Sequence, residues 1–352
     1  MTPAFWSGKR VFLTGHTGFK GSWLTMWLAS AGATVRGYAL TPPTNPSLFD
    51  LAKVAELCDH HVGDVRDAAA LTRALTEFRP DIVIHMAAQP LVRLSYDQPV
   101  ETYSTNVMGT VNLFEAARRA PSVRAIVNVT TDKCYENREW VWGYRENDPM
   151  GGFDPYSSSK GCAELVTSAY ARSYFSKADG PTLGSGRAGN VIGGGDWAQD
   201  RLVPDIVKAF VANDEVRIRR PDSVRPWQHV LEPLSGYLLL AEKLWAHGQA
   251  FAGGWNFGPS PDAVQPVRKI ADSIVAMWNE PRQWIDASDP NDVHEARLLQ
   301  LDSTKARVDL GWAPRWTFDI ALSNTIDWYQ KAQKPGSARD LCLAQIAQYA
   351  AA

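Results

Sequence analysis

Short apolar runs alternate with longer amphipathic stretches along the first half of the chain. The apolar runs fall at residues 10–14, 33–39, 81–86 and 125–129, and helical patterns lie between them at 67–78 and 107–119. Runs of this length predict buried strands, and a period near 3.6 residues predicts helices. Strands that alternate with helices form βαβ units, whose crossovers force a parallel sheet with helices on both faces. We therefore predict a doubly wound α/β fold.

The pattern changes in the second half of the chain. A long helix is expected over 156–175 and a further strand over 182–187, but beyond Asn190 prolines and glycines interrupt the helical and extended pieces. We therefore predict two regions. Residues 1–188 form a dinucleotide-binding domain, and residues 189–352 form a smaller substrate-binding region interleaved with the last strands of the sheet.

Composition and charge narrow the classes of partner. The chain has 352 residues, of which 45% are hydrophobic, which is enough to bury a large core. Its 36 basic and 38 acidic residues give a net charge of −2, so we expect no nucleic-acid partner and no anionic membrane surface. A small molecule is the expected partner.

The segments that would indicate export or a membrane span are not found. The first ten residues, MTPAFWSGKR, have no apolar stretch typical of a signal peptide, and no apolar run approaches the roughly 18 residues that a spanning helix needs. The four cysteines, Cys58, Cys134, Cys162 and Cys342, show no CxxC spacing, which argues against a zinc site and a disulfide framework. We expect a soluble protein of the reducing cytoplasm, without a bound metal.

A glycine-rich motif, Gly15-x-x-Gly18-x-x-Gly21, directly follows the first strand and opens a helix. This position makes the motif typical of a Rossmann-type dinucleotide site: Gly15 permits the tight turn, Gly18 lets a pyrophosphate approach, and Gly21 allows the helix to pack on the strand. The helix N-terminus supplies amide donors to the phosphates. The alternative is an ordinary glycine-rich turn.

The choice between NAD and NADP is left open by the next strand. An acidic residue that binds the ribose hydroxyls usually follows about 20 residues on, and here the strand Val35–Leu40 has none. Arg36 would favour a 2′-phosphate, unless it is simply a solvated strand residue. Asp64 and Val65 end the following extended segment, where the aspartate is placed to bind an adenine amino group.

A candidate catalytic pair lies on the helix expected from residue 156. Tyr156 and Lys160 are four residues apart, so their side chains share one helix face. A nearby cation stabilises a phenolate and makes tyrosine a usable base. The run Thr130–Lys133 follows the strand at 125–129, at the carboxyl edge where open sheets bind ligands, and the Thr131 hydroxyl is placed to share a substrate alcohol with Tyr156.

Together these residues resemble the extended short-chain dehydrogenase/reductase family over nearly the whole chain. The resemblance rests on the glycine motif, the strand end His85-Met86-Ala87-Ala88-Gln89, Asn106, Thr131 and the pair Tyr156 and Lys160. Within that family, a Thr-Asp-Glu triplet is typical of the nucleotide-sugar 4,6-dehydratases. This chain has Thr131-Asp132-Lys133 instead, and that departure leaves the role of the third residue open.

The resemblance implies an intramolecular redox dehydration that uses NAD. Tyr156 would take the proton from the hydroxyl on sugar carbon 4, supported by Lys160, while Thr131 orients that hydroxyl. Asp132 would protonate the carbon 6 hydroxyl as water leaves, which requires a protonated carboxyl. Lys133 stands where relatives carry the glutamate expected to take the carbon 5 proton. It is either that base or a charged group that polarises the 4-keto oxygen or pairs with Asp132.

The resemblance also implies which residues bind ligands. Besides Tyr156, Lys160 and the glycines, the cofactor set is His16, Phe19, Asp64, Val65, Ala87 and Ala88. His16 and Lys20, inside the glycine motif, lie either near the phosphates or in solvent. The substrate set is Asn190, Arg201, Arg225 and His229, in which the arginines suit a diphosphate unless they form surface ion pairs. Arg187–Asn190 and the loop 193–196 would lie near the sugar nucleotide, and His294 and Glu295 precede a stretch that resembles a ribose-contacting segment. A homodimer or higher homo-oligomer through helices 106–119 and 156–175 is implied as well.

Two other functions compete with this hypothesis. A nucleotide-sugar 4-epimerase shares the fold, the cofactor and the Tyr/Lys pair, but needs no acid and base for expelling water, so Asp132 and Lys133 favour the dehydratase. A non-catalytic dinucleotide-binding sensor is disfavoured by the complete set of Thr131, Tyr156 and Lys160. The pyrimidine base of the substrate does not follow from composition or spacing.

Overall fold

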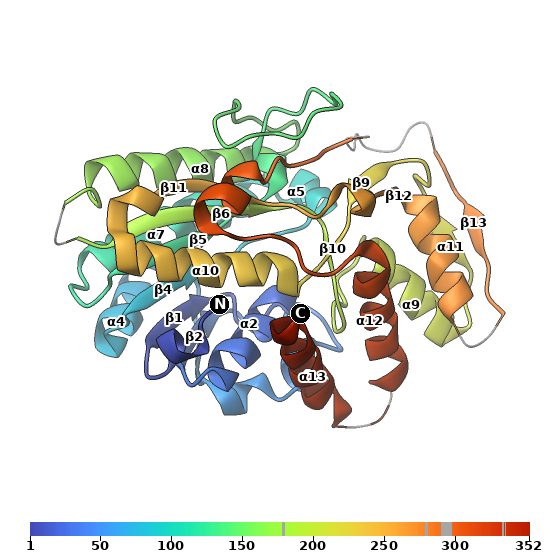
Figure 1. Ribbon diagram of the computed structural model, residues 1–352, viewed down its shortest axis with the longest axis horizontal. Coiled ribbons are helices and arrows are strands. Elements are labelled where there is room, and N and C mark those ends of the chain that lie inside the picture. Colours follow the sequence, from blue (N-terminus) through green and yellow to red (C-terminus); the bar gives the residue numbers. More distant parts are fainter. Residues whose placement is uncertain (178–179, 279–280, 290–297, 333, 335) are drawn as a thin grey trace.

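A seven-stranded parallel sheet forms the centre of the protein (Figure 1). The computed structural model describes residues 1–352 except 178–179, 279–280, 290–297, 333 and 335. The strands lie in the order β11 (Gly253–Phe257), β6 (Thr182–Ala188), β5 (Ala125–Val129), β4 (Ile82–His85), β1 (Arg10–Thr14), β2 (Thr34–Ala39) and β3 (Asp59–Val62). Each neighbouring pair is parallel. The predicted doubly wound α/β fold is confirmed.

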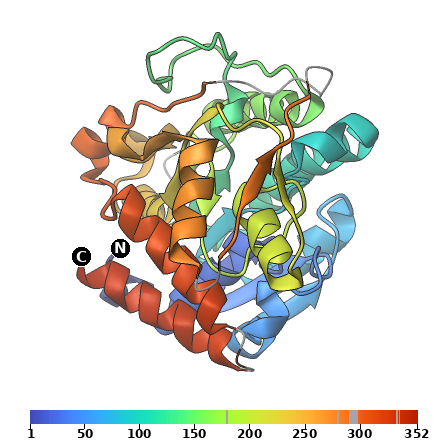
Figure 2. The same ribbon diagram turned by 90° about the vertical axis from the view of Figure 1, so that its right-hand side faces the viewer.

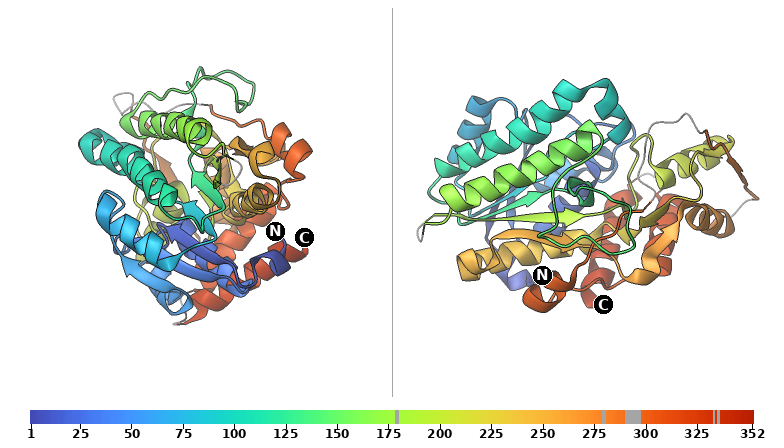
Figure 3. Two further views of the ribbon diagram at one scale, coloured as in Figure 1. Left: turned by 90° about the vertical axis from the view of Figure 1, so that its left-hand side faces the viewer. Right: turned by 90° about the horizontal axis from the view of Figure 1, so that it is seen from above.

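Helices cover both faces of this sheet (Figure 3). One face carries α4 (Ala68–Phe78), α7 (Gly109–Arg118) and α8 (Pro155–Ser173); the other carries α2 (Phe19–Ser30), α10 (Leu231–His247) and α13 (Ser337–Ala351). Alternate strand residues enter the two cores: Phe12 and Ile126 point to the first, Val11 and Val127 to the second. Each fully buried side chain of this size contributes roughly 1.5–3 kcal/mol to stability.

The smaller region lies beyond the carboxyl ends of the strands, to the right of the sheet in Figure 1 and toward the viewer in Figure 2. It holds α9 (Leu202–Ala212), α11 (Val267–Met277) and α12 (Phe318–Lys331). Three two-stranded ladders join them: β7 (Val191–Ile192) with β10 (Gln228–His229), β9 (Val224–Pro226) with β12 (Val264–Pro266), and β8 (Val216–Ile218) with β13 (Trp284–Asp286). The same half of the chain also supplies α10 and β11, so it returns to the main sheet after forming part of this region.

Several short elements do not follow from the hydrophobic pattern. These are α1 (Pro3–Trp6), α3 (Leu48–Leu51), α5 (Val92–Asp97) and α6 (Pro99–Tyr103), which are too short for a helical period to register. The helix expected over 107–119 instead starts as a π-helical turn at Ser104–Met108 that runs on from α6 into α7. Among the described residues, no helix is long and apolar enough to cross a membrane.

Candidate active site

A large cavity opens where the strands end and the smaller region begins. Its volume is about 1740 Å³, and its lining runs from the glycine motif past β4, β5 and β6 to α9 and β8. A cavity for one drug-sized ligand measures about 300–1000 Å³. This one therefore has room for two bound molecules side by side.

The glycine motif forms one end of the cavity. Gly15 has a φ of +77°, and a Cβ there would lie 2.7 Å from the backbone nitrogen of Ala87. At Gly21 a Cβ would lie 2.1 Å from the carbonyl oxygen of Gly15, so neither position admits a side chain. Helix α2 begins directly after Gly18 without a capping side chain. This cradle fits a dinucleotide pyrophosphate, because it presents backbone amides with no side chain in the way.

Most of the other predicted cofactor residues line the cavity. Phe19, Asp64, Val65, Ala87 and Ala88 all line the cavity. The Asp64 carboxylate accepts hydrogen bonds from the Arg66 backbone nitrogen at 2.8 Å and from its guanidinium, and these bonds lower the pKa of Asp64.

Two basic residues at this end lie elsewhere than the sequence suggests. His16 is buried away from the cavity, where its Nε2 lies 2.7 Å from Nδ1 of His60 and its ring packs on Gly37. Burial lowers the pKa of His16 to about 3, so its ring is neutral. Arg36 is paired with Asp59 at 2.5 Å and does not line the cavity, so it offers no site for a 2′-phosphate.

Lys20 reaches into the cavity from the first turn of α2. Burial lowers the pKa of its amine to about 7, and the charges of Arg201 and Lys160 add to this effect, while those of Asp132 and Asp196 oppose it. Lys20 therefore lies at the cavity, near the predicted catalytic residues, rather than in solvent.

The Tyr/Lys pair is set by the start of helix α8. The Asp154 side chain accepts a hydrogen bond from the Ser157 backbone nitrogen at 2.9 Å, and Pro155 occupies the first position of the helix. Tyr156 therefore lies in the first turn and Lys160 one turn later, and both line the cavity. Lys160 Nζ donates to the carbonyl oxygen of Val129 at 3.3 Å.

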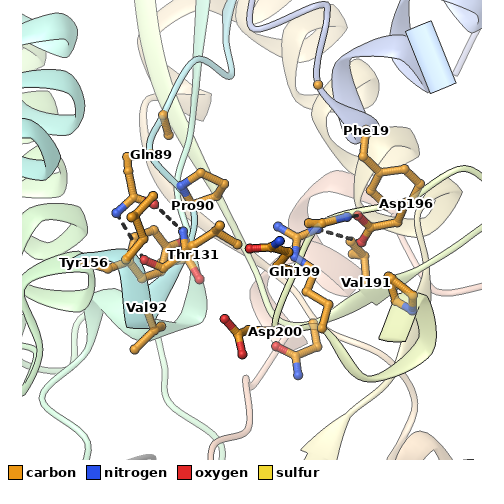
Figure 4. A pocket seen from close by; sticks show the side chains of 18 of the residues that line it. Phe19, Gln89, Pro90, Val92, Thr131, Tyr156, Val191, Asp196, Gln199 and Asp200 are labelled. Atoms are coloured by element: carbon orange, nitrogen blue, oxygen red, sulfur yellow. Dashed lines mark hydrogen bonds and ion pairs between the residues drawn. The ribbon is translucent and has the colours of Figure 1, made fainter. Parts of the chain in front are cut away.

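The Tyr156 phenol lies close to Thr131 (Figure 4). Burial raises the pKa of Tyr156 to about 12, whereas a hydrogen bond with Thr131 and the charge of Arg201 lower it. Burial also lowers the pKa of the Lys160 amine to about 8, and the charge of Glu164 opposes that shift. In this structure the Lys160 amine, which was expected to favour the phenolate, instead donates a hydrogen bond to the carbonyl oxygen of Val129 at the end of β5.

The run Thr131–Lys133 forms a tight turn beside the phenol. Thr131 Oγ1 donates to Asp132 Oδ1 at 3.0 Å and accepts a hydrogen bond from the Lys133 backbone nitrogen at 3.4 Å. Asp132 is only 3% exposed and sits behind the lining formed by Thr131 and Lys133. Burial raises the pKa of Asp132, while the neighbouring charge of Lys133 opposes this shift. The direction is the one that a proton-donating carboxyl requires.

Of the four predicted substrate residues, three line the cavity: Asn190, Arg201 and Arg225. The Arg201 guanidinium pairs with Asp196 Oδ2 at 2.7 Å. The side chain of His229 is not part of the cavity lining: it is 0% exposed and held between the rings of Trp23 and Trp316. His294 and Glu295 lie outside the described residues.

Other residues at the cavity escaped the sequence analysis. Asp200 lines the cavity (Figure 4), with its Oδ1 2.9 Å from Arg219 Nη2 and 3.9 Å from Nε of Arg93 on α5. Arg187, expected near the sugar nucleotide, is instead buried in an ion pair with Glu164 at 2.7 Å. The sequence offered one signal for Glu164: it lies four residues after Lys160 and therefore on the same face of the helix.

Comparison with known proteins agrees with this geometry. The family model described as GDP-mannose 4,6 dehydratase matches residues 12–325. The chain is 56% identical over 330 residues to a CDP-glucose 4,6-dehydratase of Salmonella typhimurium, covering 93% of this chain and 92% of that protein. It is 27% identical to a dTDP-glucose 4,6-dehydratase of Xanthomonas campestris pv. campestris, covering 90% of this chain and 92% of that one.

A solved structure shows the same arrangement. The dTDP-glucose 4,6-dehydratase DesIV from Streptomyces venezuelae, with NAD and TYD bound, superposes with a TM-score of 0.77 at 25% identity, covering 92% of this chain and 97% of that one. The match of the family model extends from β1 into α12 and so includes the glycine motif, the turn Thr131–Lys133 and the Tyr/Lys pair. This chain belongs to the GDP-mannose 4,6 dehydratase family.

Proposed function

We propose that this chain is an NAD-dependent CDP-glucose 4,6-dehydratase, a hydro-lyase that converts CDP-D-glucose to CDP-4-keto-6-deoxy-D-glucose and water. One observation carries the proposal. A chain 56% identical to a CDP-glucose 4,6-dehydratase brings Tyr156, Lys160 and the turn Thr131–Lys133 together at the wall of one cavity. NAD, held by the glycine motif, would supply a hydride acceptor for sugar carbon 4 and a hydride donor for carbon 6, so the reaction would consume no reductant.

The first step needs a base at the carbon 4 hydroxyl. Tyr156 takes that proton, and Thr131, which shares a hydrogen bond with the phenol, orients the hydroxyl. The positive charge of Arg201 favours the phenolate against the effect of burial, and Lys160 would add to this effect by turning its amine from the Val129 carbonyl toward the phenol. At the end of the cavity formed by the glycine motif, the glycines hold the pyrophosphate of the cofactor. The rest of the dinucleotide is surrounded by Phe19, Asp64, Val65, Ala87 and Ala88. The His16 side chain has no part in this set.

The second step expels water across carbons 5 and 6. The 4-keto group makes the carbon 5 proton acidic, the neutral amine of Lys133 removes it, and Asp132 gives its proton to the departing carbon 6 hydroxyl. When the hydride is returned to carbon 6, the Lys133 ammonium gives its proton back to carbon 5. Burial raises the pKa of Asp132, which favours the protonated carboxyl that this step needs. Asn190, Arg201 and Arg225 hold the diphosphate of the substrate, because guanidinium groups suit phosphate oxygens.

The direct test is to incubate the protein with CDP-glucose, dTDP-glucose and UDP-glucose and to follow the loss of water by mass spectrometry. We expect CDP-glucose to lose one water in preference to the other two sugars. Conversion to an isomer of unchanged mass would indicate a 4-epimerase, and binding without turnover would indicate a sensor. Either result would overturn the proposal.

We expect the purified protein to contain NAD without any being added, because the hydride has to be kept and returned within one turnover. Denaturing extraction followed by chromatography should release NAD. A protein that contains NADP, or that consumes NADPH in step with product, would carry out ordinary reduction and contradict the internal redox cycle.

Changing Lys133 to Met should separate oxidation of the sugar from removal of the carbon 5 proton. The variant is expected to reduce its nicotinamide when CDP-glucose is added, and to exchange the carbon 5 proton with deuterated water more slowly than the wild type. The two signals are followed by absorbance and by mass spectrometry. Exchange and water loss at the wild-type rate would mean that Lys133 only polarises the keto oxygen or pairs with Asp132.

We further propose that the protein forms a homodimer, or a larger homo-oligomer, through α7, α8 and the π-helical turn before α7. Large apolar side chains are exposed on neighbouring elements there: Val100 is 81% exposed, Leu165 60% and Met108 51%. Exposed apolar groups gathered on one face are typical of an interface. Light scattering should give at least twice the monomer mass, and Leu165→Glu should lower it; a wild-type monomer would contradict the proposal.

Two further proposals concern organisation and location. The chain divides into a dinucleotide-binding domain, residues 1–188, and a substrate-binding region, residues 189–352, whose β11 and α10 return to the sheet. The four cysteines are free thiols, which supports a place in the reducing cytoplasm.

A further inference from the structure

A buried carboxylate lies beneath the catalytic turn. Glu164 is 4% exposed and stands one helical turn beyond Lys160 on the inner face of α8. Its Oε1 accepts a hydrogen bond from the Thr130 hydroxyl at 2.5 Å. Its Oε2 accepts from Ser185 Oγ at 2.8 Å and from Arg187 Nη2 at 2.7 Å. The mechanism above uses none of these contacts.

We propose that Glu164 is a positioning residue: through the Thr130 hydroxyl it fixes the turn Thr131–Lys133 against helix α8, which carries Tyr156 and Lys160. The inference deepens the proposed function and rests on it. Glu164 touches neither substrate nor cofactor, and it acts by setting where the proton donor and acceptor of the elimination stand.

The first argument is that α8 holds the strand end at two consecutive residues. Lys160 Nζ donates to the carbonyl oxygen of Val129, and Glu164 accepts from the side chain of Thr130. These are the last residue of β5 and the one after it, directly before the turn. Because the two contacts come from successive turns of one helix, they fix both the height and the rotation of the chain as it leaves the sheet.

The second argument is that Glu164 is itself immobile. Its carboxylate has three hydrogen-bond donors from two different strand segments, and a buried carboxylate with such partners keeps one rotamer. Arg187 is anchored further, because its Nη1 donates to the hydroxyl of Tyr135 at 2.6 Å and to the carbonyl oxygen of Glu146 at 3.1 Å. Burial opposes ionisation, but the charge of Arg187 and its hydrogen bond lower the pKa of Glu164. The pair therefore stays charged.

The third argument concerns what the turn needs. Asp132 and Lys133 act on adjacent carbons of the sugar, and an error of about 1 Å in such a group can cost about a hundredfold in rate. Of the residues that act in the oxidation, Tyr156 and Lys160 belong to α8 itself and only Thr131 belongs to the turn, whereas both groups of the elimination belong to the turn. Loosening the contact between Thr130 and Glu164 should therefore slow the loss of water more than the oxidation of the sugar.

The test uses Thr130→Val, because removing Glu164 would leave Arg187 buried without its counter-ion and endanger folding. The matched control is Thr167→Val. Thr167 lies on the same helix, and its hydroxyl accepts a hydrogen bond at 2.8 Å from Asn128 Nδ2 on the same strand β5, further from the turn. Each variant loses one buried hydrogen bond that joins α8 to β5 or to the residue directly after it. Thr130→Ser restores the hydroxyl and serves as the rescue.

The readouts are the melting temperature, the rate of nicotinamide reduction by CDP-glucose and the rate of water loss. Both valine variants should melt at similarly lowered temperatures. For Thr130→Val we expect water loss to slow by about tenfold or more and nicotinamide reduction to slow by about threefold at most, so that reduced cofactor accumulates. Thr167→Val should keep the wild-type ratio of the two rates, and Thr130→Ser should return close to it.

Two results would overturn the inference: an unchanged ratio in Thr130→Val, or the same altered ratio in both valine variants. A wild-type protein that does not dehydrate CDP-glucose would instead overturn the proposed function. The wild-type assay precedes the variants, so the two failures are told apart.

Discussion

Changing Tyr156 to Phe is expected to lower the rate of nicotinamide reduction by CDP-glucose by about 10²- to 10⁴-fold, the range seen when a general base is removed. The ring keeps its place in the first turn of α8, where it is 8% exposed, so substrate affinity should change little. The lost group is the hydroxyl that shares a hydrogen bond with Thr131. Single-turnover absorbance of the reduced nicotinamide measures this step directly.

Tyr170→Phe provides the matched control. Tyr170 lies on the same helix, but its hydroxyl donates to Glu115 at 2.9 Å on the outer side, away from the cavity. This variant should reduce its cofactor at close to the wild-type rate. If Tyr156→Phe did the same, the base would have to be a different group.

Changing Asp132 to Asn should leave oxidation of the sugar largely intact and slow the loss of water by about 10²- to 10⁴-fold, because an amide keeps the shape of the carboxyl and cannot supply its proton. Reduced nicotinamide should then build up after CDP-glucose is added, since the hydride has no acceptor at carbon 6. Stopped-flow absorbance shows the accumulation, and mass spectrometry shows the missing product. Turnover close to the wild-type rate would exclude Asp132 as the acid.

The pH dependence should identify the same group. Burial raises the pKa of Asp132, so its protonated form persists to a higher pH than that of an exposed carboxyl. As pH rises through this value, water loss should decline, whereas oxidation of the sugar, which needs the deprotonated phenol, should not. Wild-type enzyme should therefore accumulate more reduced nicotinamide at higher pH, and Asp132→Asn should lose this dependence.

The parts of the site that depend on local spacing could be predicted from the sequence. The glycine motif, the turn after β5 and the pair Tyr156 and Lys160 each depend on positions a few residues apart, and the alternation of strand and helix brings them to one edge of the sheet. The cavity lining contains all of the predicted glycines and four of the five predicted catalytic residues, while Asp132 lies just behind it.

The direction of a side chain in a loop could not be predicted in the same way. His16 and His229 both stand next to functional residues in the sequence, and both turn into the interior, where His60 and two tryptophan rings receive them. Packing partners more than 40 residues away decide that outcome, as His60 does for His16 at a separation of 44. Lys20 illustrates the converse: no periodicity indicates that its amine reaches the catalytic groups.

The substrate side shows a further limit of pattern reading. Its strands contain two or three residues each, as in β7 and β10, too few for alternation to be visible. The contact of Asp200 with Arg93 joins residues more than a hundred positions apart, and only the tertiary fold brings them together.

Because β11 forms the edge of the sheet, β6 lacks its outer neighbour during part of the synthesis of this protein. Strand β6 ends at Ala188, but its outer neighbour begins only at Gly253, so during synthesis the emerging chain holds β6 with its hydrogen-bonding edge open. An uncovered edge strand is a template for pairing with another chain. The nascent polypeptide is expected to be most prone to association between the emergence of β6 and the emergence of β11 from the ribosome, and chaperones should retain most strongly the chains that are stalled in that interval.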